Sequence, residues 1–190
     1  MRAPSPLLIL LVILLFVPAG CRGVAATHRS NVKGDSTMSF ALTTTAFSPG
    51  GEIPARYTCS GANLSPALAW TDVPAGARSL ALIADDPDAP MGTWTHWLVW
   101  NLPARDGALP EGVPSHEVLA NGARQGTTDF RRIGYGGPCP PPGRSHHYFF
   151  TLYALDASLN LMPGSTRSEL EAAMKPHVLA KAEVMGTFRR

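Results

Sequence analysis

The stretch that decides the fold is a polar, proline-containing loop between two apolar runs. It reads Asp86-Pro87-Asp88-Ala89-Pro90-Met91-Gly92-Thr93-Trp94-Thr95-His96-Trp97. Residues 80–84 before it and 97–100 after it are short and apolar, as expected for β-strands. Polar groups on a proline-stiffened loop between strands more often form a functional site than a packing device. We therefore interpret this loop as a candidate binding or catalytic site.

The composition of the 190-residue chain is that of a single globular domain. Hydrophobic residues make up 45% and charged residues 16%, which favours a packed core over disorder. The formal net charge is only +2, and no basic run is interleaved with aromatic residues. The sequence therefore gives no support for nucleic-acid binding.

Residues 1–21 are typical of a bacterial export signal. Arg2 gives a positive start, and residues 7–17 form an apolar run shorter than the roughly 20 residues of a membrane-spanning helix. Residues 18–21, Pro-Ala-Gly-Cys, resemble a lipobox with proline where leucine is usual, which predicts a lipidated Cys21. Residues 24–26 offer an alternative cleavage site. Both interpretations predict export, either as a membrane-anchored lipoprotein facing the periplasm or cell exterior, or as a soluble periplasmic or secreted protein.

The three cysteines fit this interpretation. If Cys21 carries lipid, Cys59 and Cys139 remain and could form a disulfide in an oxidising compartment. The alternative is two separate thiols. Residues 22–37 are small and polar and predict a flexible tether, so the folded domain is expected to span residues 38–190.

From about residue 39 to residue 153 the pattern is that of β-structure. Short apolar stretches alternate with Gly, Pro, Asp and Asn. The expected strands cover residues 39–47, 68–70, 79–84, 96–101 and 147–155. Residues 102–145 are rich in Gly and Pro and predict long loops, which in compact domains are often functional.

Alternation along the predicted strand 96–101 assigns its side chains to two faces. His96, Leu98 and Trp100 are expected on one face, and Trp97 and Val99 on the other. In the same way, His146 and Tyr148 are expected to share a face that His147 does not.

Helical patterns are confined to the C-terminal end. Thr166 and Glu169 have the spacing of a capping box, and Pro176 ends that segment. Residues 178–185 predict a second short helix that ends at Gly186. The expected fold class is therefore mainly β with small C-terminal helices.

A second cluster of polar residues follows a loop of glycines and prolines. It reads Gly134-Tyr135-Gly136-Gly137-Pro138-Cys139-Pro140-Pro141-Pro142-Gly143-Arg144-Ser145-His146-His147-Tyr148. Histidine ring N–H groups, a tyrosine hydroxyl and backbone N–H groups are the donors that a phosphate needs. Asp86 could accept from a histidine or bind an ammonium group, and it should raise the pKa of a nearby histidine.

Together the two clusters resemble the two signatures of the phosphatidylethanolamine-binding protein family, also called the Raf kinase inhibitor protein family. Residues 86–90 and 94–97 resemble the first signature, and residues 137–141, 143 and 146–148 the second. Residues 57–66 and 134–135 are similar to the bacterial branch. The resemblance covers residues 38–190.

The resemblance implies a β-sandwich of antiparallel sheets with a small anion pocket. It implies ligand binding by Asp86, His96, Gly137, Pro138, His146 and Tyr148, and a pocket wall containing Asp88, Pro90 and Trp94. Relatives bind phosphate-like and carboxylate-like groups, including phospholipid headgroups, without a cofactor. The Ala89–Pro90 peptide is expected to be cis. Animal relatives close the pocket with a C-terminal tyrosine, which residues 185–190 lack, so this pocket is expected to be more open or gated differently.

Non-catalytic binding of a small anionic group is the predicted function, and the sequence identifies neither the physiological ligand nor a partner protein. Three alternatives remain open at this point. Asp86, His96, His146 and Cys139 could be metal ligands, although no tightly spaced ligand pair is present. The His/Asp pocket could serve a hydrolase, although the chain has no Gly-x-Ser-x-Gly motif. The protein could also be an exported inhibitor of a protease or a kinase-like enzyme.

Overall fold

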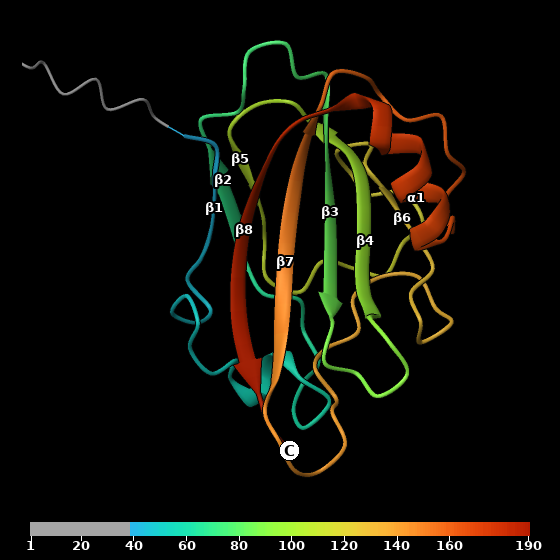
Figure 1. The fold of residues 1–190 in the computed structure, drawn as a ribbon. Helices are drawn as coiled ribbons and strands as arrows, with labels where there is room; N and C mark the ends of the chain where they lie inside the picture. Colours follow the sequence, from blue (N-terminus) through green and yellow to red (C-terminus); the bar gives the residue numbers. More distant parts are fainter. Residues whose placement is uncertain (1–38) are drawn as a thin grey trace, which may run out of the picture. The chain divides into compact units, whose positions relative to one another are not determined.

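A computed structural model of the protein describes residues 39–190 (Figure 1). The predicted signal segment, the tether and Cys21 lie outside the described residues. The elements, in chain order, are β1 (Ala41–Thr44), the 3-10 helix η1 (Ala55–Tyr57), β2 (Leu68–Thr71), β3 (Ser79–Asp86), β4 (Trp94–Pro103), β5 (Gly107–Leu109), β6 (Arg124–Gln125), β7 (His146–Leu155), α1 (Arg167–Met174), the 3-10 helix η2 (Lys175–His177) and β8 (Val178–Phe188).

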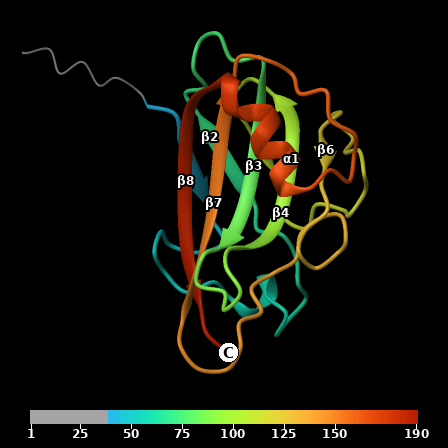
Figure 2. The same cartoon turned by 45° about the vertical axis from the view of Figure 1, so that its right-hand side comes forward.

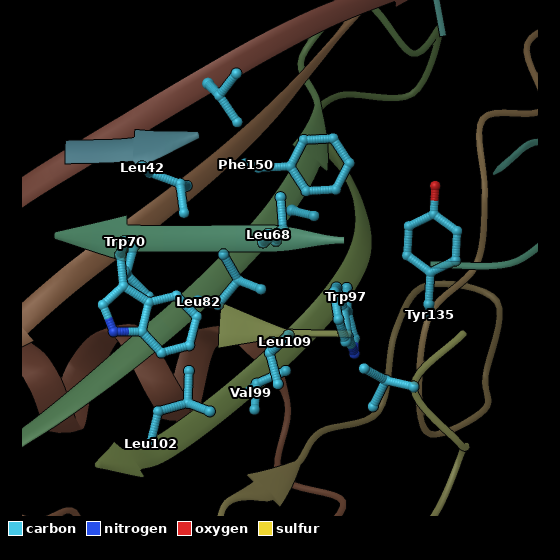
Figure 3. Close-up of a cluster of buried hydrophobic side chains, with 14 of the residues drawn as sticks. Leu42, Leu68, Trp70, Leu82, Trp97, Val99, Leu102, Leu109, Tyr135 and Phe150 are labelled. Carbon is cyan, nitrogen blue, oxygen red and sulfur yellow. The ribbon is translucent and has the colours of Figure 1, made fainter. Parts of the chain in front are cut away.

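The strands form two antiparallel sheets. One sheet has the order β1-β2-β5 and the other the order β6-β4-β3-β7-β8. Their inner faces enclose the larger hydrophobic core, to which β2 contributes Leu68 and Trp70 and β4 contributes Trp97 and Val99 (Figure 3). The predicted sandwich of antiparallel sheets is therefore confirmed.

The five-stranded sheet is also covered on its outer face. Leu170 and Met174 of α1 pack there against a smaller core that includes Ile83, Leu98 and Trp100. Figure 2 shows α1 lying across this sheet. Burial on both faces explains why β3 is an almost continuous apolar run and not an alternating one.

The C-terminal end departs from the expectation in one element. The capping box is present, with the Thr166 side chain accepting from the Glu169 N–H and the Glu169 carboxylate accepting from the Thr166 N–H. The predicted second helix at 178–185 is wrong, because those residues belong to β8, which pairs with β7 along its length. Ala182 and Val184 point into the core while Lys181 and Glu183 are exposed, which is the two-residue period of a strand.

A β-bulge in β4 changes the predicted direction of one site residue. Ala84 of β3 pairs with Trp97, but the next residue, Asp85, pairs with Thr95, so His96 is an extra residue without a partner in β3. Such a bulge redirects a side chain relative to regular alternation. Leu98 and Trp100 follow the predicted faces, whereas His96 turns toward Tyr148 on the sandwich side, with ring centroids 5.2 Å apart. The expectation that His96 shares a face with Leu98 and Trp100 is therefore wrong.

Two other expectations concern covalent structure. Cys59 and Cys139 form a disulfide. No cis peptide bond occurs in residues 39–190, so the predicted cis Ala89–Pro90 bond is wrong. The trans bond lies in a turn that is closed by the Gly92 N–H, which donates to the Ala89 carbonyl oxygen at 3.1 Å.

Candidate functional site

The two polar clusters meet at one end of the sandwich. Asp86 is the last residue of β3, Trp94 the first residue of β4 and His146 the first residue of β7. Because β3 is antiparallel to both neighbours, its end lies beside their beginnings (Figure 1). The topology therefore brings residues 60 positions apart, Asp86 and His146, into contact.

A cavity of about 230 Å³ opens at this end. Its lining residues are Asp86, Ala89, Pro90, Trp94, His96, Phe130, Cys139, Pro140, Pro141 and His146. Five residues of the predicted site are therefore brought together around one space: Asp86, Pro90, Trp94, His96 and His146. The other four, Asp88, Gly137, Pro138 and Tyr148, lie around the cavity without lining it.

Asp86 and His146 form a buried pair. Nδ1 of His146 lies 2.8 Å from Oδ2 of Asp86, and each residue is only 3% exposed. The second carboxylate oxygen, Oδ1, accepts from the backbone N–H of Asp88 at 2.8 Å. With Nδ1 of His146 donating to the carboxylate, Nε2 is the ring nitrogen left for a ligand.

His96 is held in a similar way by the backbone. Its Nδ1 donates to the carbonyl oxygen of Gly136, and the Gly136 N–H donates back to the His96 carbonyl oxygen at 2.9 Å. Burial lowers the pKa of His96 below its ordinary value of 6.5, against the smaller opposing effects of the Gly136 carbonyl and the Asp86 carboxylate. The Asp86 carboxylate acts in the predicted direction, but desolvation outweighs its charge, so the expected net rise in the pKa of His96 is wrong.

Tyr148 lies beside His96 but behind the cavity surface. Its hydroxyl is buried and has no hydrogen-bond partner among the described residues. Burial, and secondly the charge of Asp86, raise the pKa of Tyr148, so this hydroxyl stays protonated. A buried donor without a partner is costly, so the Tyr148 hydroxyl is a candidate to donate to a ligand or a water.

An aromatic pair forms another part of the lining. Phe130 packs edge-on against Trp94 and against His96, with ring centroids 5.5 Å and 5.2 Å apart. Sequence reasoning missed Phe130; its position in the Gly- and Pro-rich region 102–145 was the available signal. Asp129 positions it, since its carboxylate accepts from the Thr95 N–H of β4 at 2.6 Å. The Trp94 indole N–H is buried and has no partner within residues 39–190.

Asp88 supports the site from outside the cavity. Its carboxylate accepts from the backbone N–H of His147 at 2.9 Å and from Nδ1 of the same residue at 2.6 Å. These bonds lower the pKa of Asp88. Arg144 donates to the Asp88 carbonyl oxygen at 2.7 Å. His147 is exposed while His146 and Tyr148 are buried, which confirms the predicted alternation at the start of β7.

Gly137 and Pro138 hold the loop in place behind the lining. The Gly137 N–H donates to Oδ1 of Asn63 at 2.8 Å, so this donor is already engaged inside the protein. A Cβ at Gly137 would lie 2.3 Å from the Tyr57 carbonyl oxygen, so only glycine fits there. The adjacent disulfide then fixes Cys139, which lines the cavity together with Pro140 and Pro141.

Two further observations limit the chemistry of the described residues. Residues 39–190 contain no cluster of three or more His, Cys, Asp or Glu side chains arranged to hold a metal ion, and the thiol of Cys139 is used in the disulfide. In the same part of the chain, no helix has the length and hydrophobicity needed to span a bilayer.

The fold and the cavity define a β-sandwich protein with a small polar site at the end of its strands. The family model for phosphatidylethanolamine-binding protein matches residues 43–189. The chain therefore belongs to the phosphatidylethanolamine-binding protein family.

Individual relatives support this assignment. A UPF0098 protein of Methanothermobacter thermautotrophicus is 51% identical over 149 residues, which cover 78% of this chain and 98% of the relative. The structure resembles that of a putative phosphatidylethanolamine-binding protein homologue, CT736, from Chlamydia trachomatis, with a TM-score of 0.73, 42% identity and coverage of 80% and 98%. It also resembles E. coli YbcL, a member of the mammalian family, with a TM-score of 0.74, 32% identity and coverage of 80% and 99%.

Proposed function

We propose that the cavity binds a small anionic group, such as phosphate, a phospholipid headgroup or a carboxylate, without catalysing a reaction. The observation that carries this proposal is the pair of buried histidines, His96 and His146, on one cavity of about 230 Å³. Both Nδ1 atoms are held by acceptors, Gly136 and Asp86. Each ring therefore presents Nε2 to a ligand, and a protonated Nε2 donates a charge-assisted hydrogen bond to an anion.

The surroundings favour the anionic part of a headgroup over an ammonium group. Each oxygen of Asp86 already accepts a hydrogen bond, from His146 and from the Asp88 backbone. The buried donors without partners, the Trp94 indole and the Tyr148 hydroxyl, are also suited to an acceptor ligand. Phosphate and phosphorylethanolamine should therefore bind with similar affinity.

Calorimetric titration with inorganic phosphate, phosphorylethanolamine and acetate tests the proposal. His96→Gln and His146→Gln should each lower phosphate affinity about tenfold or more, as expected for the loss of a hydrogen bond to a charged group. His116→Gln, at an exposed position, is the matched control and should bind like the wild type. Equal phosphate affinity in the wild type and both cavity variants would remove the proposed site.

The pH dependence gives a second readout. Because the pKa of His96 is lowered in the ligand-free protein, its ring must gain a proton when it donates to an anion. Phosphate affinity should therefore fall as pH rises through the histidine range, and binding near neutral pH should take up protons. Titrations in buffers of different ionisation enthalpy measure that uptake. An affinity that stays constant between about pH 5 and pH 8 would contradict this mechanism.

We also propose that the protein is exported and anchored to the membrane by lipid on Cys21. The apolar run 7–17 and the lipobox-like residues 18–21 support this, as does the Cys59–Cys139 disulfide, since disulfides persist in oxidising compartments. The intact mass of the mature protein should correspond to a chain that begins with a lipidated Cys21. Cys21→Ser should release it from the membrane fraction. A mass that begins at residue 27 would instead support cleavage after Ala26.

A further inference from the structure

A second cavity lies on the outer side of the five-stranded sheet, between the start of β4 and the first turns of α1. Its volume is about 360 Å³, within the range of roughly 300–1,000 Å³ that is usual for ligand pockets. Trp94 lines the cavity that contains His96, whereas its neighbours Thr93 and Thr95 line the second one. The two cavities share no lining residue, so they are separate sites.

The lining of the second cavity is entirely polar. Of its nine residues, six carry a hydroxyl and three carry a charged group. Thr95 is only 2% exposed, and its backbone N–H and C=O groups both bond to Asp129, at 2.6 and 3.2 Å. The Thr95 hydroxyl itself has no hydrogen-bond partner within residues 39–190. Because a buried hydroxyl without a partner is costly, Thr95 is suited to bind a polar ligand in this cavity.

The charged groups of the lining are held in fixed positions by the protein. Nε of Arg167 donates to Oε1 of Glu171 at 2.7 Å, and its Nη2 donates to Oδ2 of Asp85 at 2.7 Å. The third nitrogen, Nη1, is buried and has no partner in the part of the chain that the structure describes. Oδ2 of Asp129 accepts from the Thr95 N–H, which leaves Oδ1 as a further acceptor. The cavity therefore presents both donors and acceptors in a preorganised arrangement.

This combination of groups selects one class of ligand. A carboxylate only accepts hydrogen bonds and a guanidinium only donates them, so the ligand must both donate and accept. An anion has no hydrogen for Asp129 or Glu171 and is repelled, since three carboxylates, including Asp85, surround the single guanidinium. An ammonium group offers no acceptor to Arg167. Sugar hydroxyls donate and accept at neighbouring positions, as this lining requires.

We propose that the cavity between β4 and α1 binds a neutral pyranose sugar. Asp129 accepts from a sugar hydroxyl, Arg167 donates to a sugar oxygen, and the hydroxyls of Thr95 and Ser168 bond to further hydroxyls of the ring. None of the nine lining residues is aromatic, so binding relies on hydrogen bonds made in competition with water. The dissociation constant for a monosaccharide should therefore be about millimolar.

Nuclear magnetic resonance titration with two matched pairs of sugars tests the ligand class. The pairs are glucose with glucuronate, and galactose with galacturonate, in which the second member adds a carboxylate to the same ring. At least one neutral sugar should shift the backbone amides of Thr95, Asp129 and Ser168, and its acid should bind about tenfold more weakly or worse. No shift at these amides with either neutral sugar up to about 100 mM, or an acid that binds as tightly as its neutral partner, would overturn the proposal.

Two hydroxyl deletions test the site itself. Thr95→Val replaces a hydroxyl without a partner by a methyl group, so its urea midpoint should match that of the wild type, while sugar affinity should fall about three- to tenfold. Ser168→Ala, at an exposed position of α1, should lower sugar affinity to a similar extent. Thr43→Val, an exposed strand threonine in the other sheet, is the control and should bind like the wild type. Unchanged sugar affinity in either folded variant would rule out this site.

Discussion

His96 lines the cavity, and its imidazole ring is buried and neutral. Burial lowers its pKa below 6.5, so the folded protein holds this proton less readily than the unfolded chain does. The contribution of His96 to stability is therefore fully present above the unfolded value, and it is lost as pH falls toward the folded value. An anion that favours the protonated ring opposes this loss.

Urea denaturation at a series of pH values checks this consequence. We expect the free energy of unfolding of the wild type to fall as pH decreases below about 6.5, and the slope to be smaller in His96→Gln. Phosphate should restore stability more at low pH than at neutral pH in the wild type. Identical pH slopes in both proteins would show that His96 does not carry this dependence.

Tyr148 differs from His96 because its buried hydroxyl is a hydrogen-bond donor that would have an acceptor only in a bound ligand. Because its hydroxyl has no partner in residues 39–190, replacing it removes a desolvation cost and no bond. Tyr148→Phe should leave the unfolding free energy unchanged or raise it by up to about 1 kcal/mol. If the hydroxyl donates to the bound anion, the same variant should lose phosphate affinity. A loss of stability above about 1 kcal/mol would instead indicate a structural bond to this hydroxyl.

At the level of elements, α1 is short and depends on its ends. It has eight residues, and the reciprocal bonds of the capping box satisfy the N–H groups of Thr166 and Glu169 at its N-terminus. Leu170 and Met174 fasten it over the outer face of the sheet. The cap therefore contributes to the covering of the smaller core.

Thr166→Ala should lower the free energy of unfolding by about 1 kcal/mol, the usual effect of removing an N-cap side chain. Ser168→Ala, two residues later on the exposed surface, is the matched control and should change stability little. Chemical denaturation of both variants measures the difference. Equal stability in the two would mean that the capping box contributes nothing to this helix.

The elements also show how far the sequence could predict the fold. The strands around 79–84, 96–101 and 147–155 were predictable because each is a short apolar run bounded by turn residues. β8 was not, because Ala, Lys and Glu are common in helices and the alternation of residues 180–184 is short. Pairing with β7 decides that segment, and only tertiary structure supplies that partner.

The main residues of the site were predictable from the sequence, but their arrangement in space was less so. Asp86, His96 and His146 were found from the two motifs, and all three line the cavity. The direction of His96 was not predictable, since a bulge depends on the register between two strands. Phe130 was missed because its loop is ordered by long-range bonds such as that of Asp129 to Thr95.

At the scale of the whole molecule, one covalent bond joins distant parts of the chain around the cavity. Cys59 and Cys139 are 80 residues apart, and the second of them lines the cavity. Closing so long a loop restricts the unfolded chain strongly. The disulfide therefore contributes to stability and also fixes one side of the site.

Replacing both cysteines, Cys59→Ser with Cys139→Ser, should lower the free energy of unfolding by roughly 2–5 kcal/mol. Phosphate affinity should fall as well, because Pro140 and Pro141 are then held less firmly. A reducing agent should destabilise the wild type to a similar extent and leave the double variant unaffected. Urea denaturation with and without reductant measures this, and a wild type insensitive to reductant while fully reduced would contradict the expectation.

Because the disulfide fixes one side of the cavity, ligand binding by each molecule depends on whether that disulfide has formed. Thiols stay reduced in the cytoplasm, so a chain exported as we propose would lack this link until it had crossed the membrane. For a protein exported as we propose, abundant cytoplasmic phosphate esters would meet only an unfinished cavity. The cavity with its disulfide formed would meet only the solutes outside the cytoplasm, so the fraction of protein with bound ligand would depend on the ligand concentration in that compartment alone.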